Sequence, residues 1–352
     1  MSPRERVQAA CDRREPDKVP KTAGFTPAVL ETFRRETGRD DPAAYFDIEM
    51  RGIGFRPAAE QPDFSEYYPE GVPDGARFTE YGTMHVPAHF WHFTGMRFPM
   101  THLESVEELE AFPWPDFTAA YRHAHLEADA ERLHAAGFWV NGSVGHIYET
   151  AWQMTGMERL LSDCILNLER SAYILDRIME DRCFVARRVA EAGADMLSLG
   201  DDVGMQHKLM MHPDMWREWL KPRLAKVIRA GREVNPDIHV FYHSDGNIQD
   251  IIPDLIEVGV TVLNPIQPEC MDPIRLKREY GDRLAFWGTI GTQTTMPFGT
   301  AEEVKATVRE MCETVGEGGG LILAPTHVLE PDVPWENIVA FFEACEEYGR
   351  YW

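Results

Sequence analysis

Short apolar segments alternate with longer amphipathic segments through the last two thirds of the chain, from about Gly137 onward. The apolar segments lie at residues 138–142, 196–200, 239–242, 261–264, 284–288 and 321–324. Continuously apolar strands that are separated by helices are typical of a parallel sheet covered on both faces. This alternation therefore predicts a parallel β/α architecture.

Two further strands are expected earlier, at residues 18–22 and near residues 50–55, and they bring the number of β/α units to eight. Eight units close a (β/α)8 barrel, whose active site lies at the C-terminal ends of the strands. The alternative is an open, doubly wound sheet, but no Gly-x-Gly-x-x-Gly motif follows any expected strand. We therefore predict an α/β fold, a (β/α)8 TIM barrel with an N-terminal extension.

Residues 61–114 interrupt this alternation. They are rich in proline, glycine and aromatic residues, including Phe90-Trp91-His92-Phe93, and have the character of a hairpin-bearing insertion that could cover one mouth of the barrel. The histidines in and near this stretch, among them His89 and His92, are read as structural. No internal repeat, low-complexity tract or linker divides the chain. We expect residues 1–352 to form a single domain with an insertion at about 61–114.

The composition limits the partners and the compartment. The chain of 352 residues has 58 acidic and 35 basic residues and a formal net charge of −23, which argues against nucleic acid and anionic membranes as partners. Its six cysteines are scattered without a Cys-x-x-Cys pair, as is typical of reduced thiols in a cytoplasm. No apolar run approaches the roughly 20 residues of a membrane helix, and the first residues do not read as a signal segment. We expect a cytoplasmic protein.

Two of the expected strands end by presenting a histidine. His243 and Asp245 follow strand 239–242, and Gly246 allows a sharp turn there. His327 follows the last strand, 321–324. An imidazole pair and a carboxylate with an open coordination position are typical of a catalytic metal site. The alternatives are a hydrogen-bonded loop in which Asp245 caps a helix, and a metal-free role for His327 as a general acid.

Polar side chains follow four more strand ends. They are Asp202 and Gln206 after 196–200, His146 and Glu149 after 138–142, Asn264 at the end of 261–264 with Gln267 after it, and Gln293 after 284–288. Asp202, Glu149 and His327 are candidates for proton transfer. His146 and the amide side chains are candidates for orienting a polar substrate. For each of them, capping of a helix or solvation of a loop is the alternative reading.

Together these residues resemble the uroporphyrinogen decarboxylase superfamily, which also contains zinc-dependent methyltransferases acting on methylated corrinoid proteins. The resemblance runs from residues 4–7 and 16–20 to the C-terminus, and its most specific stretches are 200–206 with the following helix 213–222, then 243–248 and 318–337. It implies a (β/α)8 barrel.

The decarboxylases bind the carboxylates of a tetrapyrrole through the arginine of a Gln-Ala-Gly-Arg-Tyr motif. The matching stretch here is 22–26, and Phe25 stands at the arginine position. His327 matches the histidine of their Gly-His-Gly motif, although Thr326 and Val328 replace the glycines. A pocket without that arginine would hold a polycarboxylate poorly.

The methyltransferases hold zinc through a His-x-Cys pair and a later cysteine. By this resemblance His243 matches the histidine, and Asp245 and His327 stand at the two cysteine positions. The resemblance therefore implies a divalent metal bound by His243, Asp245 and His327. Zinc is the first choice, with Mn or Fe as alternatives because nitrogen and oxygen ligands are harder than thiolates.

The resulting function hypothesis is a metal-dependent enzyme of this superfamily that carries out methyl transfer or demethylation of a small polar substrate. The chain contains no corrinoid-binding Asp-x-His-x-x-Gly motif, so a corrinoid would arrive on a separate partner protein. The resemblance also implies a homodimer. The alternatives are a metal-free decarboxylase (a lyase) and a ligand-binding barrel without catalysis.

Overall fold

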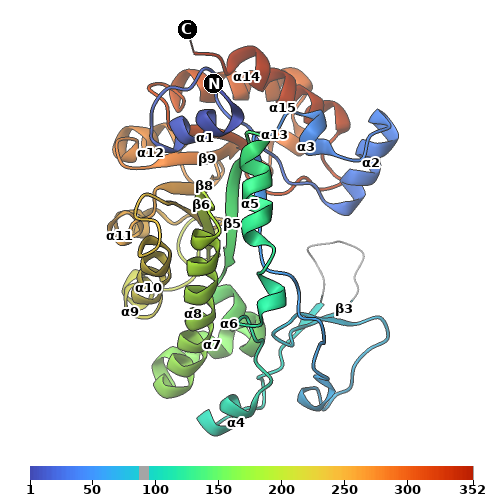
Figure 1. Cartoon of the computed structure of the whole chain (residues 1–352), viewed down its shortest axis with the longest axis vertical. Coiled ribbons are helices and arrows are strands. Elements are labelled where there is room, and N and C mark those ends of the chain that lie inside the picture. Colours follow the sequence, from blue (N-terminus) through green and yellow to red (C-terminus); the bar gives the residue numbers. More distant parts are fainter. Residues whose placement is uncertain (87–94, 352) are drawn as a thin grey trace.

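A parallel sheet of seven strands forms the centre of the described part of the chain, in the order β1-β5-β6-β7-β8-β9-β10 (Figure 1). The computed structural model describes residues 1–86 and 95–351. The strands are β1 (Met50–Ile53), β5 (Trp139–Gly145), β6 (Met196–Gly200), β7 (His239–His243), β8 (Val262–Ile266), β9 (Ala285–Ile290) and β10 (Leu321–Pro325). Each overlaps a segment predicted from the sequence, because strands buried on both faces are continuously apolar.

An extended segment takes the eighth position beside β10. Thr22 donates its N–H to the Leu323 carbonyl at 2.9 Å, and Leu323 donates to the Pro20 carbonyl at 2.9 Å. On the other side, the N–H of Lys21 donates to Glu49, the residue before β1, at 3.2 Å. Because Pro20 has no N–H, the predicted strand 18–22 is reduced to two isolated bridges, one between Lys21 and Leu323 and one between Lys18 and Arg350. The predicted TIM-barrel fold is confirmed.

Helices cover the outside of the sheet and alternate with its strands along the chain (Figure 1). The α-helices are α1 (Pro3–Cys11), α2 (Pro27–Thr37), α3 (Pro42–Tyr45), α4 (Val106–Ala111), α5 (Leu126–Ala135), α6 (Tyr148–Thr155), α7 (Met157–Leu166), α8 (Leu168–Glu191), α9 (Pro213–Trp219), α10 (Lys221–Arg232), α11 (Ile252–Val258), α12 (Pro273–Tyr280), α13 (Thr295–Phe298), α14 (Ala301–Thr314) and α15 (Trp335–Tyr348). Three short 3₁₀ helices are η1 (Ser65–Tyr67), η2 (Ala120–Arg122) and η3 (Gln249–Ile251).

Helix α1 closes the N-terminal end of the barrel. A capping box between Ser2 and Glu5 starts the helix, and the buried Val7 and Cys11 pack in one cluster with Trp139 and other residues inside the barrel. The barrel interior is therefore plugged at this end. Its C-terminal end is the one available for a site.

The predicted insertion contains a small antiparallel sheet, β2 (Arg77–Phe78), β3 (Met84–Val86) and β4 (Gly95–Arg97). Tyr81 from this insertion donates its hydroxyl to Asp181 of α8 at 3.2 Å, and the guanidinium of Arg182 lies 5.3 Å from the centre of its ring. These contacts hold the insertion against α8. The segment 90–93, with His89 and His92, lies outside the described residues.

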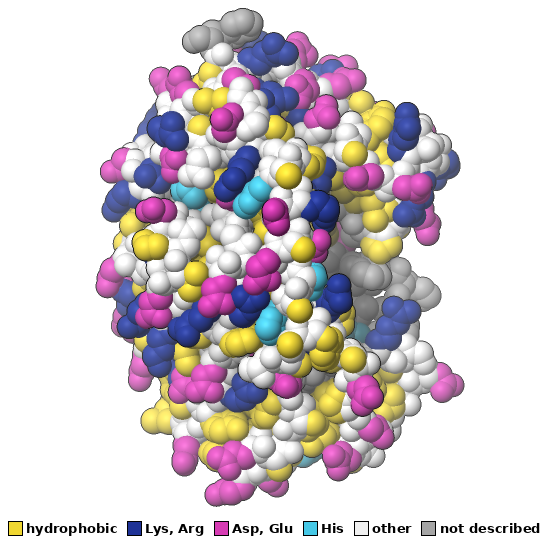
Figure 2. All heavy atoms as spheres, in the orientation of Figure 1, with side chains coloured by type: hydrophobic (Ala, Val, Ile, Leu, Met, Phe, Trp, Pro, Cys, Tyr) yellow, Lys and Arg dark blue, Asp and Glu magenta, His cyan; other side chains and the backbone are white. Residues whose placement is uncertain are grey.

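Charged side chains of both signs are interspersed over the face of the molecule seen in Figure 2. Among the described residues, no helix has the length and apolar character that crossing a membrane requires.

Candidate functional site

The end of β7 brings three candidate ligands together. Ligand atoms of Asp202, His243 and Asp245 all lie within 4.8 Å of one another, and the three side chains are partly exposed. Two glycines make this possible, because the loops after β6 and β7 touch through their backbones. A Cβ at Gly204 would lie 2.3 Å from the Asp245 carbonyl oxygen, and Gly246 has a positive φ of 80°. The pair predicted on β7 therefore meets an aspartate from β6.

The side chain of Asn264 on β8 fixes the orientation of the His243 ring. Asn264 donates through Nδ2 to the Trp287 carbonyl at 3.3 Å, which turns its Oδ1 toward His243. Nδ1 of His243 donates to that oxygen at 2.6 Å. The other ring nitrogen, Nε2, faces Asp202 Oδ1 at 3.4 Å. This arrangement leaves Nε2 as the nitrogen that can bind a cation.

Asp245 carries a carboxylate oxygen that lacks a protein partner. Its backbone N–H donates to Asp202 Oδ1 at 2.8 Å, but its own Oδ1 is buried with no hydrogen-bond partner among the described residues. Burial raises the pKa of Asp245, and the charge of His243 opposes this shift. Buried polar atoms normally have a partner, so an unpaired oxygen beside a second carboxylate and an imidazole nitrogen fits a bound divalent cation.

His327 lies beside this group at the end of β10. Its Nε2 is 3.9 Å from Asp245 Oδ2, and its side chain is 36% exposed. The compact group of three is completed by Asp202, which the sequence analysis assigned to proton transfer. The sequence analysis assigned the third ligand position to His327. The role of His327 as a metal ligand stays a prediction.

His146 and Glu149 form a hydrogen-bonded pair after β5. Burial disfavours the imidazolium of His146, but the bond to Glu149 prevails and raises its pKa. The ring centres of His146 and His243 are 6.4 Å apart, so the pair faces the cluster. Asp201 supports it from β6, because its Oδ1 accepts the N–H of Glu149 at 2.9 Å.

Asp201 is a member of the site that the sequence analysis did not select. It is buried, and burial raises the pKa of its carboxyl to about 7. Asp201 also accepts an N–H from the first turn of α6, so it combines a capping contact with its place beside the cluster. The burial of Asp201 and its closeness to Glu149 could not be seen in the sequence.

The predicted amide side chains divide into two kinds. Asn264 and Gln267 are buried, and Gln267 Oε1 accepts the N–H of Gly246 at 2.6 Å. Their polar atoms therefore hold the β7 loop. Gln206 and Gln293 are exposed on neighbouring loops and both contact Glu269: Gln206 Nε2 donates to its carbonyl at 3.0 Å, and the Gln293 N–H donates to its Oε1 at 3.1 Å.

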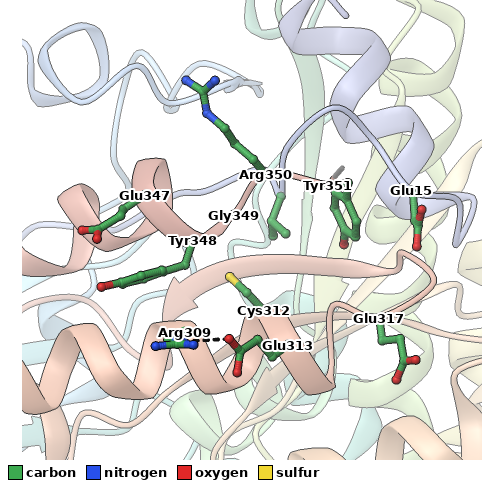
Figure 3. A pocket seen from close by; sticks show the side chains of 11 residues that line it. Glu15, Arg309, Cys312, Glu313, Glu317, Glu347, Tyr348, Gly349, Arg350 and Tyr351 are labelled. Carbon is green, nitrogen blue, oxygen red and sulfur yellow. Dashed lines mark hydrogen bonds and ion pairs between the residues drawn. The ribbon is translucent and has the colours of Figure 1, made fainter.

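A separate hollow of about 670 Å³ lies where α14 leads into the N-terminal end of β10 (Figure 3). Cys312 and Arg309 of α14 line it together with the C-terminal residues Tyr348 to Tyr351. Burial raises the pKa of the Cys312 thiol to about 12, so this thiol is not a nucleophile at neutral pH. The hollow carries none of the predicted site residues.

The fold and the strand-end cluster define the class: a TIM barrel that gathers imidazole and carboxylate groups at its C-terminal mouth. The sequence then identifies the family. Residues 99–348 match the sequence model of uroporphyrinogen decarboxylase (URO-D), and the chain belongs to this family.

Within this family, the chain is similar to methyltransferases. Two proteins named methylcobamide:CoM methyltransferase MtaA, from Methanosarcina barkeri and from its strain Fusaro / DSM 804, are 30% and 28% identical to this chain over 174 residues. That stretch covers 49% of this chain and 48% of each relative, so the match spans about half the length of these relatives. A solved methyltransferase from Methanosarcina mazei has the same fold, with a TM-score of 0.68, 20% identity and 99% of both chains covered.

Proposed function

We propose that this protein is a metal-dependent methyltransferase that transfers a methyl group to or from a small polar molecule. The observation that carries the proposal is the cluster of Asp202, His243 and Asp245 in a member of the URO-D family that aligns with methylcobamide:CoM methyltransferases. The unpartnered Oδ1 of Asp245 supports a cation at this point.

The metal would be held by His243 Nε2 and by carboxylate oxygens of Asp202 and Asp245, with His327 beside them. This donor set suits zinc and also Mn(II) or Fe(II), because it contains no thiolate. When bound, such an ion would act as a Lewis acid that lowers the pKa of a thiol or hydroxyl group.

The residues of the chain itself have separate tasks. Asn264 fixes the His243 ring so that Nε2 stays directed at the cluster. His146, held by Glu149, faces the cluster and takes the proton that the substrate releases. Gln206 and Gln293 lie on exposed loops at the mouth, where they orient the polar part of the substrate.

The methyl group would come from, or go to, a corrinoid on a separate protein. The relatives named methylcobamide:CoM methyltransferase support this choice of partner, since their name states a methylated cobamide as a reactant. The exposed loops at the barrel mouth are the surface such a carrier would meet.

Metal analysis of the purified protein tests the proposal. The wild-type protein should retain about one equivalent of zinc after dialysis against a weak chelator, and Asp245→Ala should lose it. Asp282→Ala, in an exposed turn before β9, is the matched control and should keep the metal. Equal metal content in the Asp245→Ala and Asp282→Ala proteins would show that the ligand assignment is wrong.

The decarboxylase alternative is disfavoured by the surroundings of Phe25. Its ring stacks on Phe46 with the ring centres 6.3 Å apart, where a decarboxylase would carry a carboxylate-binding arginine. Full turnover of uroporphyrinogen by the purified protein would overturn this preference.

A further inference from the structure

Two small residues near the cluster face the inside of the barrel and are exposed to solvent. Side chains alternate between the two faces of a strand, and Met50 and Trp139 belong to the cluster inside the barrel. Gly52 on β1 and Ser143 on β5 therefore face inward as well, yet both are exposed to solvent. A Cβ at Gly52 would meet a single neighbouring atom within 4 Å, the Asn141 carbonyl oxygen at 3.9 Å. Solvent-accessible positions inside the barrel mean open space there.

This space adjoins the proposed metal ligands. Ser143 pairs with Ser198 on β6, and Ser198 pairs with Phe241 on β7, two residues before His243 on the same face of that strand. Phe241 is half-buried, and its ring contacts Trp287 edge to face with the centres 4.9 Å apart. We call the space bounded by Gly52, Ser143, Ser198 and Phe241 the Ser143 hollow.

No strand of the barrel presents a lysine or arginine to this hollow among the described residues. Arg51 is the one lysine or arginine within the seven strands, and its guanidinium lies 4.1 Å from the centre of the Phe138 ring, on the outer face. Lys21, at the eighth position, directs its ammonium group to Glu346 of α15. Arg182 is buried and donates to the His146 carbonyl at 3.0 Å and to Thr150 at 3.1 Å. Residues 87–94 contain no lysine or arginine in the sequence.

The charged groups with the largest effect on Asp245 are acidic or are histidines. They are His243, Asp202, His327 and Glu149. Two ligand carboxylates already balance the charge of a divalent ion, so the site holds no surplus positive charge for a sulfonate or carboxylate of the substrate. An anionic group placed there would lose its hydration without gaining a cationic partner.

We infer that the Ser143 hollow receives the part of the substrate beyond the reacting atom, and that this part is uncharged or cationic and not anionic. This inference rests on the proposed function, because it takes the cluster as the point where the reacting atom binds. The aromatic face of Phe241 and the surrounding carboxylates favour a quaternary ammonium group or a neutral hydroxyl.

Three thiols that share a mercaptoethyl group test the charge preference. They are thiocholine, with a quaternary ammonium that cannot bind a metal, 2-mercaptoethanol, which is neutral, and 2-mercaptoethanesulfonate, which is anionic. Binding to the zinc-loaded protein is measured by titration calorimetry at constant ionic strength. We expect the cationic and neutral thiols to bind at least about tenfold more tightly than the sulfonate.

Substitutions at Ser143 locate the preference. Ser143→Lys places a cation in the hollow and should reverse the order, so that the sulfonate binds more tightly than thiocholine. Ser143→Met has a side chain of similar length without charge, and should weaken all three thiols while keeping their order. Circular dichroism shows whether each variant is folded. The comparison of the three thiols on the wild-type protein does not depend on the variants.

The possible outcomes separate this inference from the proposed function. Tighter binding of the sulfonate to the wild-type protein, equal binding of all three thiols, or no binding of any of them overturns the inference. Failure of the proposed function would appear instead as absent zinc, or as zinc content that does not depend on Asp245, in the same protein samples.

Discussion

A buried lysine holds the eighth position of the barrel, and removing its charge tests how the barrel closes. Lys21 is 2% exposed, and its ammonium group forms an ion pair with Glu346 of α15. Its backbone N–H donates to Glu49, which is also 2% exposed. Burial raises the pKa of Glu49, and the charge of Lys21 opposes that shift. Lys21→Met keeps an apolar side chain at this position but removes the ammonium group. Glu49 then keeps its ion pair with Arg6, whose Nη1 lies 3.4 Å from Glu49 Oε1.

The expected cost follows from the burial of the partners. Removing one member of a fully buried ion pair costs about 3–5 kcal/mol. Glu346 is 44% exposed and keeps Lys18, so solvent screening lowers the expected cost to about 2–3 kcal/mol. At about 2.1 cal/mol/K per residue, the entropy of unfolding of 352 residues is about 0.7 kcal/mol/K. Each kcal/mol therefore shifts the melting temperature by about 1.4 °C, so Lys21→Met should melt roughly 3–4 °C lower.

Lys18→Met is the matched control, because Lys18 binds the same carboxylate at 2.7 Å but is 20% exposed. Its loss should cost less than about 1 kcal/mol. Thermal unfolding followed by circular dichroism compares the two variants. Equal shifts for both variants, or a shift below about 2 °C for Lys21→Met, would refute the view that the buried charge closes the barrel.

Further predictions concern the metal site, acid stability and thiol reactivity. Asn264→Ala removes the acceptor that fixes His243 and should weaken zinc binding by about 10–100-fold in a chelator competition, while Asn264→Asp should retain most of the affinity. Lys18 and Lys21 outweigh burial and lower the pKa of Glu346 from 4.5 to about 2. Its contribution to stability is therefore complete above pH 4.5 and is lost as the pH falls toward 2, and Glu346→Gln should flatten acid unfolding curves in this window. Because the pKa of Cys312 is raised to about 12, iodoacetamide should leave this thiol unmodified in the native protein at pH 8 and alkylate it in urea, as peptide mass mapping would show.

The strands of the barrel could be predicted because burial on both faces leaves a local signal. Residues 196–200 were expected as a strand and form β6 with the same bounds. Residues 18–22 show where a local signal is insufficient. Pro20 cannot donate, so this segment depends on bonds to Leu323 and on the ion pair of Lys21 with Glu346, 325 residues away. A single sequence does not contain the information that these residues meet.

Candidate site residues could be predicted where a side chain of a metal-binding type directly follows an apolar strand, as for His243 and Asp245. The position of Asp202 could not be predicted in the same way. It lies against His243 because the β6 and β7 loops approach closely at Gly204 and Gly246, where no Cβ would fit. A glycine in a loop has several explanations in a sequence, and close backbone contact is one that only the fold selects.

Asn264 and Gln267 show how burial changes the meaning of a polar residue at a barrel mouth. Both follow or end a strand and were predicted to orient the substrate, yet both are buried and their amides bind protein atoms. Each supports the neighbouring β7 segment, Asn264 through His243 and Gln267 through Gly246. Since both supports come from the strand next to β7, the geometry of the proposed ligands depends on how β7 and β8 pair. Substitutions at β8 should therefore lower metal affinity more than substrate affinity. Substitutions at Ser143 should lower substrate affinity more than metal affinity.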